Sequence, residues 1–305
     1  MNPNPVIDTD VAIIGAGTAG MSAYRAALEH TSRVLLIESG AYGTTCARVG
    51  CMPSKLLIAA ADAAHAVTGA PRFGVAAGPI KIDGRAVMAR VRSERDRFVG
   101  FVVDAVQHWP PEHRLVGHAR FVDDHTLQVG ATQVRAQRIV IATGSRPVVP
   151  EAWRLALGER LIVNDDVFDW TDLPRSVAVV GAGVIGLELA QALHRLGVRV
   201  RLYGRSERVG PLSDPQLQTL ARQVFGAELP LSVDLAHIAP RREGDSVIVR
   251  ATDRDGSVYE ERFDWLLATI GRRPNVDQLG LENTTLPRDA RGIPVHDRRT
   301  AQVGE

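Results

Sequence analysis

Two cysteines carry the most reactive chemistry in this sequence. Cys46 and Cys51 are the only cysteines, and they lie five residues apart around Gly50, with Pro53 just beyond. In a regular helix, Cα atoms five residues apart are separated by about 8.6 Å, beyond the limit of roughly 7 Å for a disulfide. A bridge therefore requires a deformed backbone, for which Gly50 and Pro53 are plausible sources. A strained bridge is easier to reduce.

The two thiols suit redox chemistry better than structural bridging. A secreted scaffold usually spreads several disulfides across its loops, whereas this chain has one closely spaced pair. If a helix starts near Pro53, its N-terminal dipole favours a thiolate at Cys51. The spacing therefore predicts a redox-active pair.

Composition narrows the class of protein. The chain has 305 residues, 45% of them hydrophobic, and a net charge of +1 spread along its length. This length predicts about two domains, and the charge disfavours nucleic acid or an anionic membrane as partner. The apolar run Val11–Ile14 is too short for a signal core or a membrane span. We expect a cytoplasmic enzyme and assign no metal site.

One glycine pattern occurs twice, each time after an apolar strand and before a helix and a second strand. The first copy contains Gly15, Gly17 and Gly20, and the second contains Gly181, Gly183 and Gly186. One glycine makes the turn, one lets the backbone approach a pyrophosphate, and one allows close helix packing. The repeat predicts an α/β fold with two Rossmann-like dinucleotide-binding domains.

The two copies differ where the second strand ends. A position 23 residues after the first glycine holds Glu38 in the first copy and Gly204 in the second, where Arg205 and Arg208 follow. A carboxylate there accepts hydrogen bonds from an unphosphorylated ribose, as in FAD. Its absence beside an arginine is compatible with NADP as well as NAD, although Arg205 could equally be a solvated surface residue.

The segment Gly43–Lys55 resembles the redox helix of the class I pyridine nucleotide-disulfide oxidoreductases, which include dihydrolipoamide, glutathione and mercuric reductases. The resemblance continues through Ile139–Gly144, the second glycine motif and Ala268–Asn275. It implies that Cys46 exchanges with the substrate and that Cys51 forms a charge-transfer thiolate on FAD. It also implies that Lys55 lies near the flavin with Glu188 as its partner, rather than both being solvated.

The resemblance assigns further cofactor contacts. The expected FAD-binding residues are Gly15, Gly17, Gly20, Glu38, Thr45, Lys55, Ala119, Ala142, Thr143 and Gly144. The expected NAD(P)-binding residues are Gly181, Gly183, Val184, Ile185, Gly186, Glu188, Gly204, Arg205 and Gly271.

The implied domains are an FAD-binding domain over 1–150, an NAD(P)-binding domain over 151–271, and a truncated return to the first over 272–305. Two helical patterns, Ser54–Gly69 and Gly84–Trp109, form an insertion in the first domain at about 54–109. Within it, a solvated face is expected for the arginines Arg90, Arg92, Arg95 and Arg97.

The sequence departs from the family pattern at its C-terminus. It ends at Glu305 without the Ala-Gly-Asp motif, the dimerisation domain or the His-Glu pair of the family. We therefore assign no catalytic histidine, expect His296 at the surface, and expect a truncated chain that is not fully competent alone. The family implies a homodimer for the full-length protein.

Within the family, the segments Tyr42–Cys46 and Tyr203–Ser206 resemble a bacterial subgroup named dihydrolipoamide dehydrogenase. This resemblance favours an enzyme like dihydrolipoyl dehydrogenase. It would move two electrons between a small or protein-bound dithiol, with a lipoyl group favoured, the Cys46–Cys51 pair, FAD and NAD(P). One alternative is an NADPH-dependent reductase of another disulfide or of a metal ion, as in glutathione or mercuric reductase. Another is a non-catalytic FAD-binding fragment or interaction module.

Overall fold

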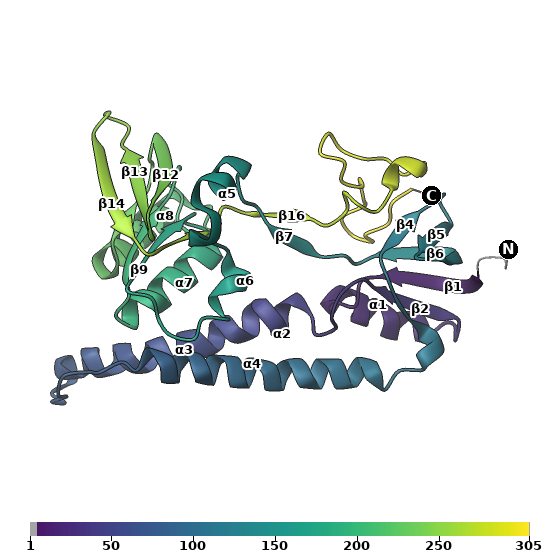
Figure 1. The fold of residues 1–305 in the computed structure, drawn as a ribbon, viewed down its shortest axis with the longest axis horizontal. Helices are drawn as coiled ribbons and strands as arrows, with labels where there is room; N and C mark the ends of the chain where they lie inside the picture. The colour runs from purple at the N-terminus through teal and green to yellow at the C-terminus, as the bar shows by residue number, and fades with distance from the viewer. Residues whose placement is uncertain (1–4, 305) are drawn as a thin grey trace. The chain divides into compact units, whose positions relative to one another are not determined.

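The computed structural model describes residues 5–304, which form two compact units. The described parts of 1–47, 98–146 and 273–305 form the first unit, and 48–97 and 147–272 form the second. Residues 1–4 and Glu305, at the ends of the predicted first and last segments, lie outside the described residues. Figure 1 draws both units and labels many of their helices and strands.

The first unit is built on a six-stranded sheet in the order β3-β2-β1-β6-β5-β4. In its parallel part, β1 (Val6–Ile14) pairs with β2 (Val34–Glu38) and with β6 (Thr132–Ile141). Helix α1 (Thr18–Leu28) connects β1 to β2, which confirms the first predicted βαβ unit. The short strands of this sheet are β3 (Arg114–Val116), β4 (Ala119–Phe121) and β5 (Thr126–Val129).

Both faces of this first sheet are covered. Ile14 and Ile37 belong to an apolar cluster on one face, whereas Ile13 and Leu36 pack with Tyr24 of α1 on the other. Successive residues of a strand point to opposite faces, so a parallel sheet buried on both sides needs near-continuous apolar strands. This requirement explains the apolar runs beside the first glycine pattern.

The second unit is built on a five-stranded parallel sheet in the order β11-β10-β9-β15-β8. Helix α7 (Val184–Arg195) connects β9 (Ser176–Val180) to β10 (Arg199–Tyr203), which confirms the second predicted βαβ unit. Helix α8 (Pro215–Glu228) follows β10. The remaining strands of this sheet are β8 (Leu161–Ile162), β11 (Leu231–Ser232) and β15 (Trp265–Ala268).

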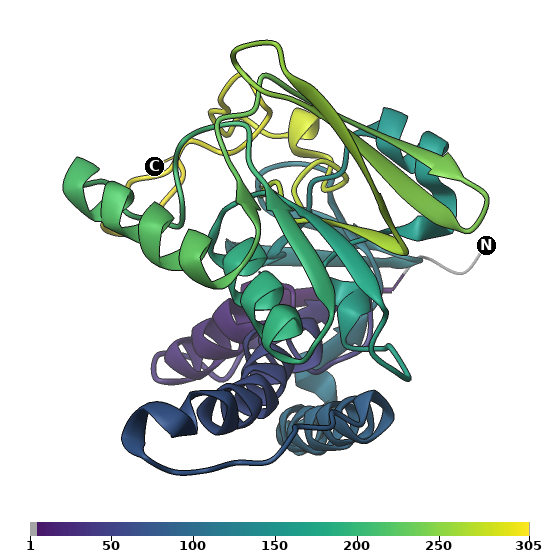
Figure 2. The ribbon, with the colours of Figure 1, turned by 90° about the vertical axis from the view of Figure 1, so that its left-hand side faces the viewer.

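A three-stranded antiparallel sheet packs against one face of the second parallel sheet. It has the order β12-β13-β14 and is seen in Figure 2. Tyr203 of β10 shares an apolar cluster with Val249 and Phe263 from this sheet. The strands are β12 (His237–Glu243), β13 (Ser246–Thr252) and β14 (Val258–Phe263).

Two long helices occupy the predicted helical insertion. They are α3 (Cys51–Gly69) and α4 (Gly84–Gln107), so α3 begins three residues before the predicted Ser54. Within the second unit, Leu57 of α3 and Met88 of α4 are fully buried in one apolar cluster with residues of α7. The same arrangement of α3 beside the first half of α4 is visible in Figures 1 and 2.

The predicted solvated face of α4 is wrong for two of its arginines. Arg90 and Arg97 are exposed, but Arg92 is half-buried and donates to the Trp170 carbonyl, and the Arg95 side chain is only 14% exposed. Its guanidinium donates to the Asp169 carboxylate at 2.5 Å and to the Phe168 carbonyl at 3.3 Å. Charge periodicity could not show this, because Asp169 is far away in the sequence.

The remaining elements are short. The chain passes from one unit to the other within elements of its secondary structure. These elements are α2 (Thr45–Val49), α4, β7 (Ser145–Pro147) and β16 (Arg272–Pro274). No helix in the described part of the chain is long and apolar enough to cross a membrane. The other helices are α5 (Glu151–Leu157), α6 (Asn164–Val167), η1 (Ala70–Phe73), η2 (Pro111–His113), η3 (Gly158–Arg160) and η4 (Leu281–Asn283).

Candidate functional site

The first glycine turn gives each glycine a different physical role. Gly15 has a φ of 107°, and a Cβ there would collide with the Ala142 carbonyl oxygen. A Cβ on Gly20 would collide with the Gly15 carbonyl oxygen, so Gly20 permits the close approach of α1. A Cβ on Gly17 would meet no described atom within 4 Å, so the space above Gly17 is open.

The second glycine turn repeats this geometry. Gly181 has a φ of 117°, and a Cβ there would collide with the Thr269 carbonyl oxygen. A Cβ on Gly186 would collide with the Gly181 carbonyl oxygen, while Gly183 faces space clear of described atoms within 4 Å. The two turns are therefore built alike in two separate units.

Both turns lead directly into helix N-termini. Gly17 precedes α1 and Gly183 precedes α7, and neither N-cap makes a side-chain hydrogen bond to the helix. The first N–H groups of a helix lack intrahelical acceptors, and the helix dipole favours an anion there. An open glycine beside uncapped N–H groups fits a dinucleotide pyrophosphate. Val184 and Ile185 are the first two residues of α7.

The ends of the second strands differ as the sequence indicates. Glu38 ends β2, and its carboxylate accepts from the Ala16 N–H at 2.7 Å and from the Gly40 N–H at 2.9 Å. Gly204 follows β10 and is buried, with Val233 only 3.1 Å from an ideal Cβ position. The first turn thus has a carboxylate at this position. The second turn has none, and a side chain at Gly204 would have to displace Val233.

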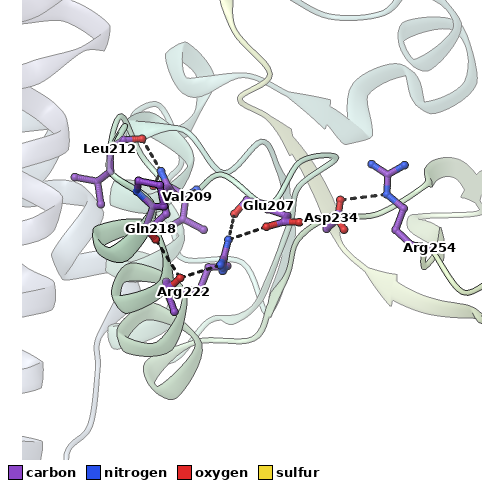
Figure 3. Close-up of polar contacts among 9 residues, drawn as sticks. Glu207, Val209, Leu212, Gln218, Arg222, Asp234 and Arg254 are labelled. Carbon is purple, nitrogen blue, oxygen red and sulfur yellow. Dashed lines mark hydrogen bonds and ion pairs between the residues drawn. The ribbon is translucent and has the colours of Figure 1, made fainter.

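A buried glutamine of α8 forms hydrogen bonds to the backbone of the loop after Gly204. Gln218 is 7% exposed, accepts from the Val209 N–H at 2.8 Å, and donates to the Leu212 carbonyl at 2.7 Å (Figure 3). Nearby, Arg222 donates to the Glu207 carboxylate at 3.3 Å. Arg205 is exposed in this loop, which places a guanidinium at the surface beside Gly204.

The cysteine segment contains the predicted break in the helix. Helix α2 ends at Val49, α3 begins at Cys51, and Gly50 between them has φ −126° and ψ −119°. Cys46 is half-buried on α2, and Cys51 is exposed as the first residue of α3. The expected deformation between the two cysteines is therefore present.

A threonine fixes the start of α2. Thr44 has a φ of 53°, and its hydroxyl accepts from the Ala47 N–H at 3.0 Å. This is the side-chain cap expected of threonine before a helix, and Thr45 is the first helical residue. The cap fixes where α2 begins, one residue before Cys46.

Lys55 and Glu188 are in direct contact. The Lys55 ammonium donates to the Glu188 carboxylate at 2.6 Å, which joins α3 to α7 within the second unit. The side chains are 58% and 34% exposed, so the pair contributes at most about 1 kcal/mol to stability. The contact shows that Lys55 and Glu188 are paired with each other, so they are not two independent solvated side chains.

The segment Ala142–Gly144 is supported from the C-terminal part of the first unit. Gly144 has a φ of 66°, and its carbonyl accepts from the Asn275 N–H at 3.0 Å. The Asn275 amide also donates to the Thr143 carbonyl at 3.0 Å and accepts from Arg146 at 2.9 Å. Arg146 also donates to Asp277, and this hydrogen bond lowers the pKa of the Asp277 carboxyl.

The other predicted contacts lie at separate places in the two units. Ala119 is buried in β4 of the first unit. Gly271, in the second unit, has a φ of 125°, and its carbonyl accepts from the Val148 N–H at 2.9 Å. His296 is exposed, as expected.

Sequence reasoning missed a polar cluster next to the cysteine segment. The buried amide of Asn164 donates to the Val49 carbonyl at 3.2 Å and to the Asp165 carboxylate at 2.8 Å. Burial raises the pKa of Asp165, although Arg272 acts against that shift. Because Asn164 is more than a hundred residues from Val49, no local pattern indicates this contact.

Comparison with known proteins gives a consistent family. Residues 9–303 match the family described as pyridine nucleotide-disulphide oxidoreductase. The chain is 30% identical over 280 residues to the mercuric reductase of Lysinibacillus sphaericus, covering 89% of this chain and 50% of that protein. It is 29% identical over 306 residues to the dihydrolipoyl dehydrogenase of Bacillus subtilis, covering 96% and 64%.

A solved structure shows the same fold. The Cu(II) complex of the HOCl-induced flavoprotein disulfide reductase RclA from Escherichia coli superimposes with a TM-score of 0.76 at 22% identity. The match covers 99% of this chain and 64% of that one. The chain thus spans between half and two thirds of the length of these relatives.

Proposed function

The chain belongs to the pyridine nucleotide-disulphide oxidoreductase family, and from this we propose that it carries the redox pair and both dinucleotide sites of a dithiol oxidoreductase. Dihydrolipoamide, or a protein-bound lipoyl group, is the favoured substrate. The observation that carries the proposal is the break at Gly50 between Cys46 and Cys51. It supplies the backbone change that a bridge across five residues requires.

We propose that the two cysteines exchange with the substrate in two steps. One substrate thiolate attacks the Cys46 sulfur, a mixed disulfide forms, and Cys51 leaves as a thiolate. The second substrate thiol then loses its proton and displaces Cys46, so the substrate leaves as a disulfide and the pair carries the two electrons. Of the two protons lost by the substrate dithiol, one goes to solution and one would accompany the two electrons onto NAD or NADP. Bound FAD would supply the two-electron acceptor, and NAD or NADP would carry the electrons as hydride.

Several residues have proposed roles in this chemistry. The position of Cys51 at the start of α3 supports its role as the thiolate next to the flavin, because a helix N-terminus favours negative charge. We propose that Lys55 lies at the flavin and that Glu188 holds its ammonium group. Ala142, Thr143 and Gly144 belong to the proposed FAD cradle, as do Thr45 and the backbone of Ala119.

The proposed nucleotide preferences follow from Glu38 and Gly204. A carboxylate at Glu38 suits the unphosphorylated ribose of FAD. Gly204 has no carboxylate to repel a 2′-phosphate, and Arg205 follows it, so the second site is compatible with NADP as well as NAD. Gly271 completes the proposed second site. A homodimer for the full-length protein remains part of the proposal, and the cytoplasmic location remains a prediction from sequence.

A second candidate is an NADPH-dependent reductase of a metal ion or another disulfide. It is supported by relatives named mercuric reductase, whose sequence identities to this chain are similar to those of dihydrolipoyl dehydrogenases. The mercuric reductase of Shigella flexneri, for example, is 34% identical over 300 residues. The absence of a carboxylate at Gly204 is compatible with NADPH. Both candidates use the same cysteine pair.

Steady-state turnover separates these functions. The protein loaded with FAD is assayed with dihydrolipoamide against NAD⁺ and NADP⁺, and with Hg²⁺ or oxidised glutathione against NADPH. Turnover with dihydrolipoamide that is lost in Cys46→Ser supports the favoured function. Turnover only with Hg²⁺ or glutathione supports the second candidate, and no turnover with any substrate supports a non-catalytic FAD-binding module.

A further inference from the structure

We propose that Asn164 is a positioning residue for the Cys46–Cys51 pair, acting through the carbonyl group of Val49. The inference rests on the proposed redox role of the two cysteines. Val49 lies three residues after Cys46 and two before Cys51, and it is the last residue of α2. Its carbonyl group is therefore at the point where the helix breaks.

Pro53 leaves the Val49 carbonyl without a donor from the helix. In a continuous helix, each carbonyl accepts from the N–H group four residues later, which for Val49 is Pro53. Proline has no N–H, and its ring clashes with the carbonyl four residues before it. The next carbonyl, that of Gly50, does accept from the Ser54 N–H at 3.1 Å.

Asn164 supplies the donor that Pro53 lacks. The Asn164 amide nitrogen lies 3.2 Å from the Val49 carbonyl oxygen, and the residue is 7% exposed. Its second N–H donates to the Asp165 carboxylate at 2.8 Å, and its oxygen accepts from Arg272 at 3.4 Å. Because all three polar sites of the amide are engaged, its orientation is fixed with the donor towards Val49.

This contact bears on the thiol–disulfide equilibrium. A straight helix places residues five apart beyond bridging distance, so a Cys46–Cys51 disulfide needs the break at Gly50. The Asn164 hydrogen bond stabilises a backbone in which the Val49 carbonyl accepts from a donor outside its own helix. Its removal should therefore cost more in the disulfide form than in the dithiol form, which can relax to other backbone conformations.

The test uses the whole 305-residue chain in dithiothreitol redox buffers, followed by alkylation and mass measurement of the fraction with bridged cysteines. We expect Asn164→Ala to lower the equilibrium constant for disulfide formation about tenfold, equal to about 30 mV for this two-electron couple. An unchanged constant would overturn the inference. The readout requires no flavin, so a failure of dithiol turnover would overturn the proposed function and leave this result standing.

Gln218→Ala is the matched control. Gln218 is as buried as Asn164, at 7%, and its amide also donates to backbone carbonyls, at Val209 and Leu212. Its removal should lower the free energy of unfolding without changing the disulfide equilibrium. An equal change in both variants would mean that the effect reports general loosening, and the positioning role of Asn164 would be wrong.

Pro53→Ala provides a second, independent variant if Asn164→Ala does not fold. It restores an N–H that can bond the Val49 carbonyl in a continuous helix, so it should also disfavour the disulfide. Asn164→Ala should then have a smaller effect on top of Pro53→Ala than it has alone. An unchanged disulfide equilibrium in Pro53→Ala, or full additivity of the two substitutions, would contradict the proposed mechanism.

Discussion

The Lys55 ammonium lies 2.6 Å from the Glu188 carboxylate, which places the two charged residues predicted near the flavin in direct contact. Both side chains are at least one third exposed, so the pair adds little to stability. We therefore expect Lys55→Met to lower the free energy of unfolding by less than about 1 kcal/mol. The rate of flavin reduction by the dithiol should fall at least about tenfold, because a positive charge near the flavin stabilises negative charge that forms there.

Asp62→Asn is the matched control for Lys55→Met. Asp62 of α3 pairs with Arg195 of α7 at 2.6 Å, so it joins the same two helices by another ion pair. Stopped-flow absorbance should show normal flavin reduction in Asp62→Asn. If both variants slowed flavin reduction equally, the contact would only hold the helices together, and the proposed role of Lys55 would be wrong.

Alanine substitutions of the glycines in the second turn should affect nucleotide affinity and the free energy of unfolding differently. Gly183→Ala has room for its methyl group and a φ of −78°, so its free energy of unfolding should change by less than about 1 kcal/mol. NAD(P)H affinity should nevertheless fall at least about tenfold, since the methyl group occupies the space proposed for the pyrophosphate. Denaturant unfolding and nucleotide titration measure the two effects.

Gly186→Ala should show the opposite balance. Its methyl group would collide with the Gly181 carbonyl, so we expect a loss of about 1–3 kcal/mol in the free energy of unfolding. A Gly183→Ala variant with normal nucleotide affinity would contradict the assignment of Gly183 to a nucleotide site.

The βαβ units could be predicted because their signals are local. The glycine spacings fix the turns, and the apolar runs before them specify strands buried on both faces. The ends of the predicted elements are less accurate than their type and order. The helix predicted over Ser54–Gly69 begins at Cys51, and the helix predicted over Gly84–Trp109 ends at Gln107.

The support of the candidate site could not be predicted in the same way. Pro53 indicates that the Val49 carbonyl lacks a helical donor, but nothing near it identifies Asn164 as the replacement. Arg95 and its partner Asp169 show the same limit, because their contact spans distant parts of the chain. Local patterns predict elements and motifs, whereas contacts between distant residues depend on packing.

Arg205 is expected to select between the two nicotinamide cofactors. It is exposed beside Gly204, where a guanidinium can bind the 2′-phosphate of NADP. Arg205→Glu should lower NADP(H) affinity at least about tenfold more than NAD(H) affinity, as measured by titration. Arg85→Glu changes an 85% exposed arginine of α4 and should leave the ratio unchanged. An unchanged ratio in Arg205→Glu would leave that arginine without a role in selectivity.

Asp165 should make stability depend on pH in a defined direction. Burial raises its pKa, so its contribution to stability is present below the ordinary aspartate pKa of about 3.9 and is lost as pH rises. Asp165→Asn cannot ionise. Its free energy of unfolding should therefore increase relative to that of the unmodified chain as pH rises from about 4 to 7.

Asp277→Asn should show the opposite sign, because the hydrogen bond from Arg146 lowers the pKa of Asp277. The contribution of Asp277 is present above the ordinary aspartate pKa, so this variant should lose relative stability as pH rises. Denaturant unfolding at several pH values measures both variants. A pH-independent difference for Asp165→Asn would contradict the inferred effect of burial.

Anaerobic addition of a dithiol to the FAD-loaded protein tests the central claim most directly. Absorbance at wavelengths longer than those of the flavin alone reports a thiolate in contact with the flavin. Cys46→Ser should retain this band, because Cys51 is the proposed thiolate at the flavin, and Cys51→Ser should lose it. A long-wavelength band that persists in Cys51→Ser would contradict the account.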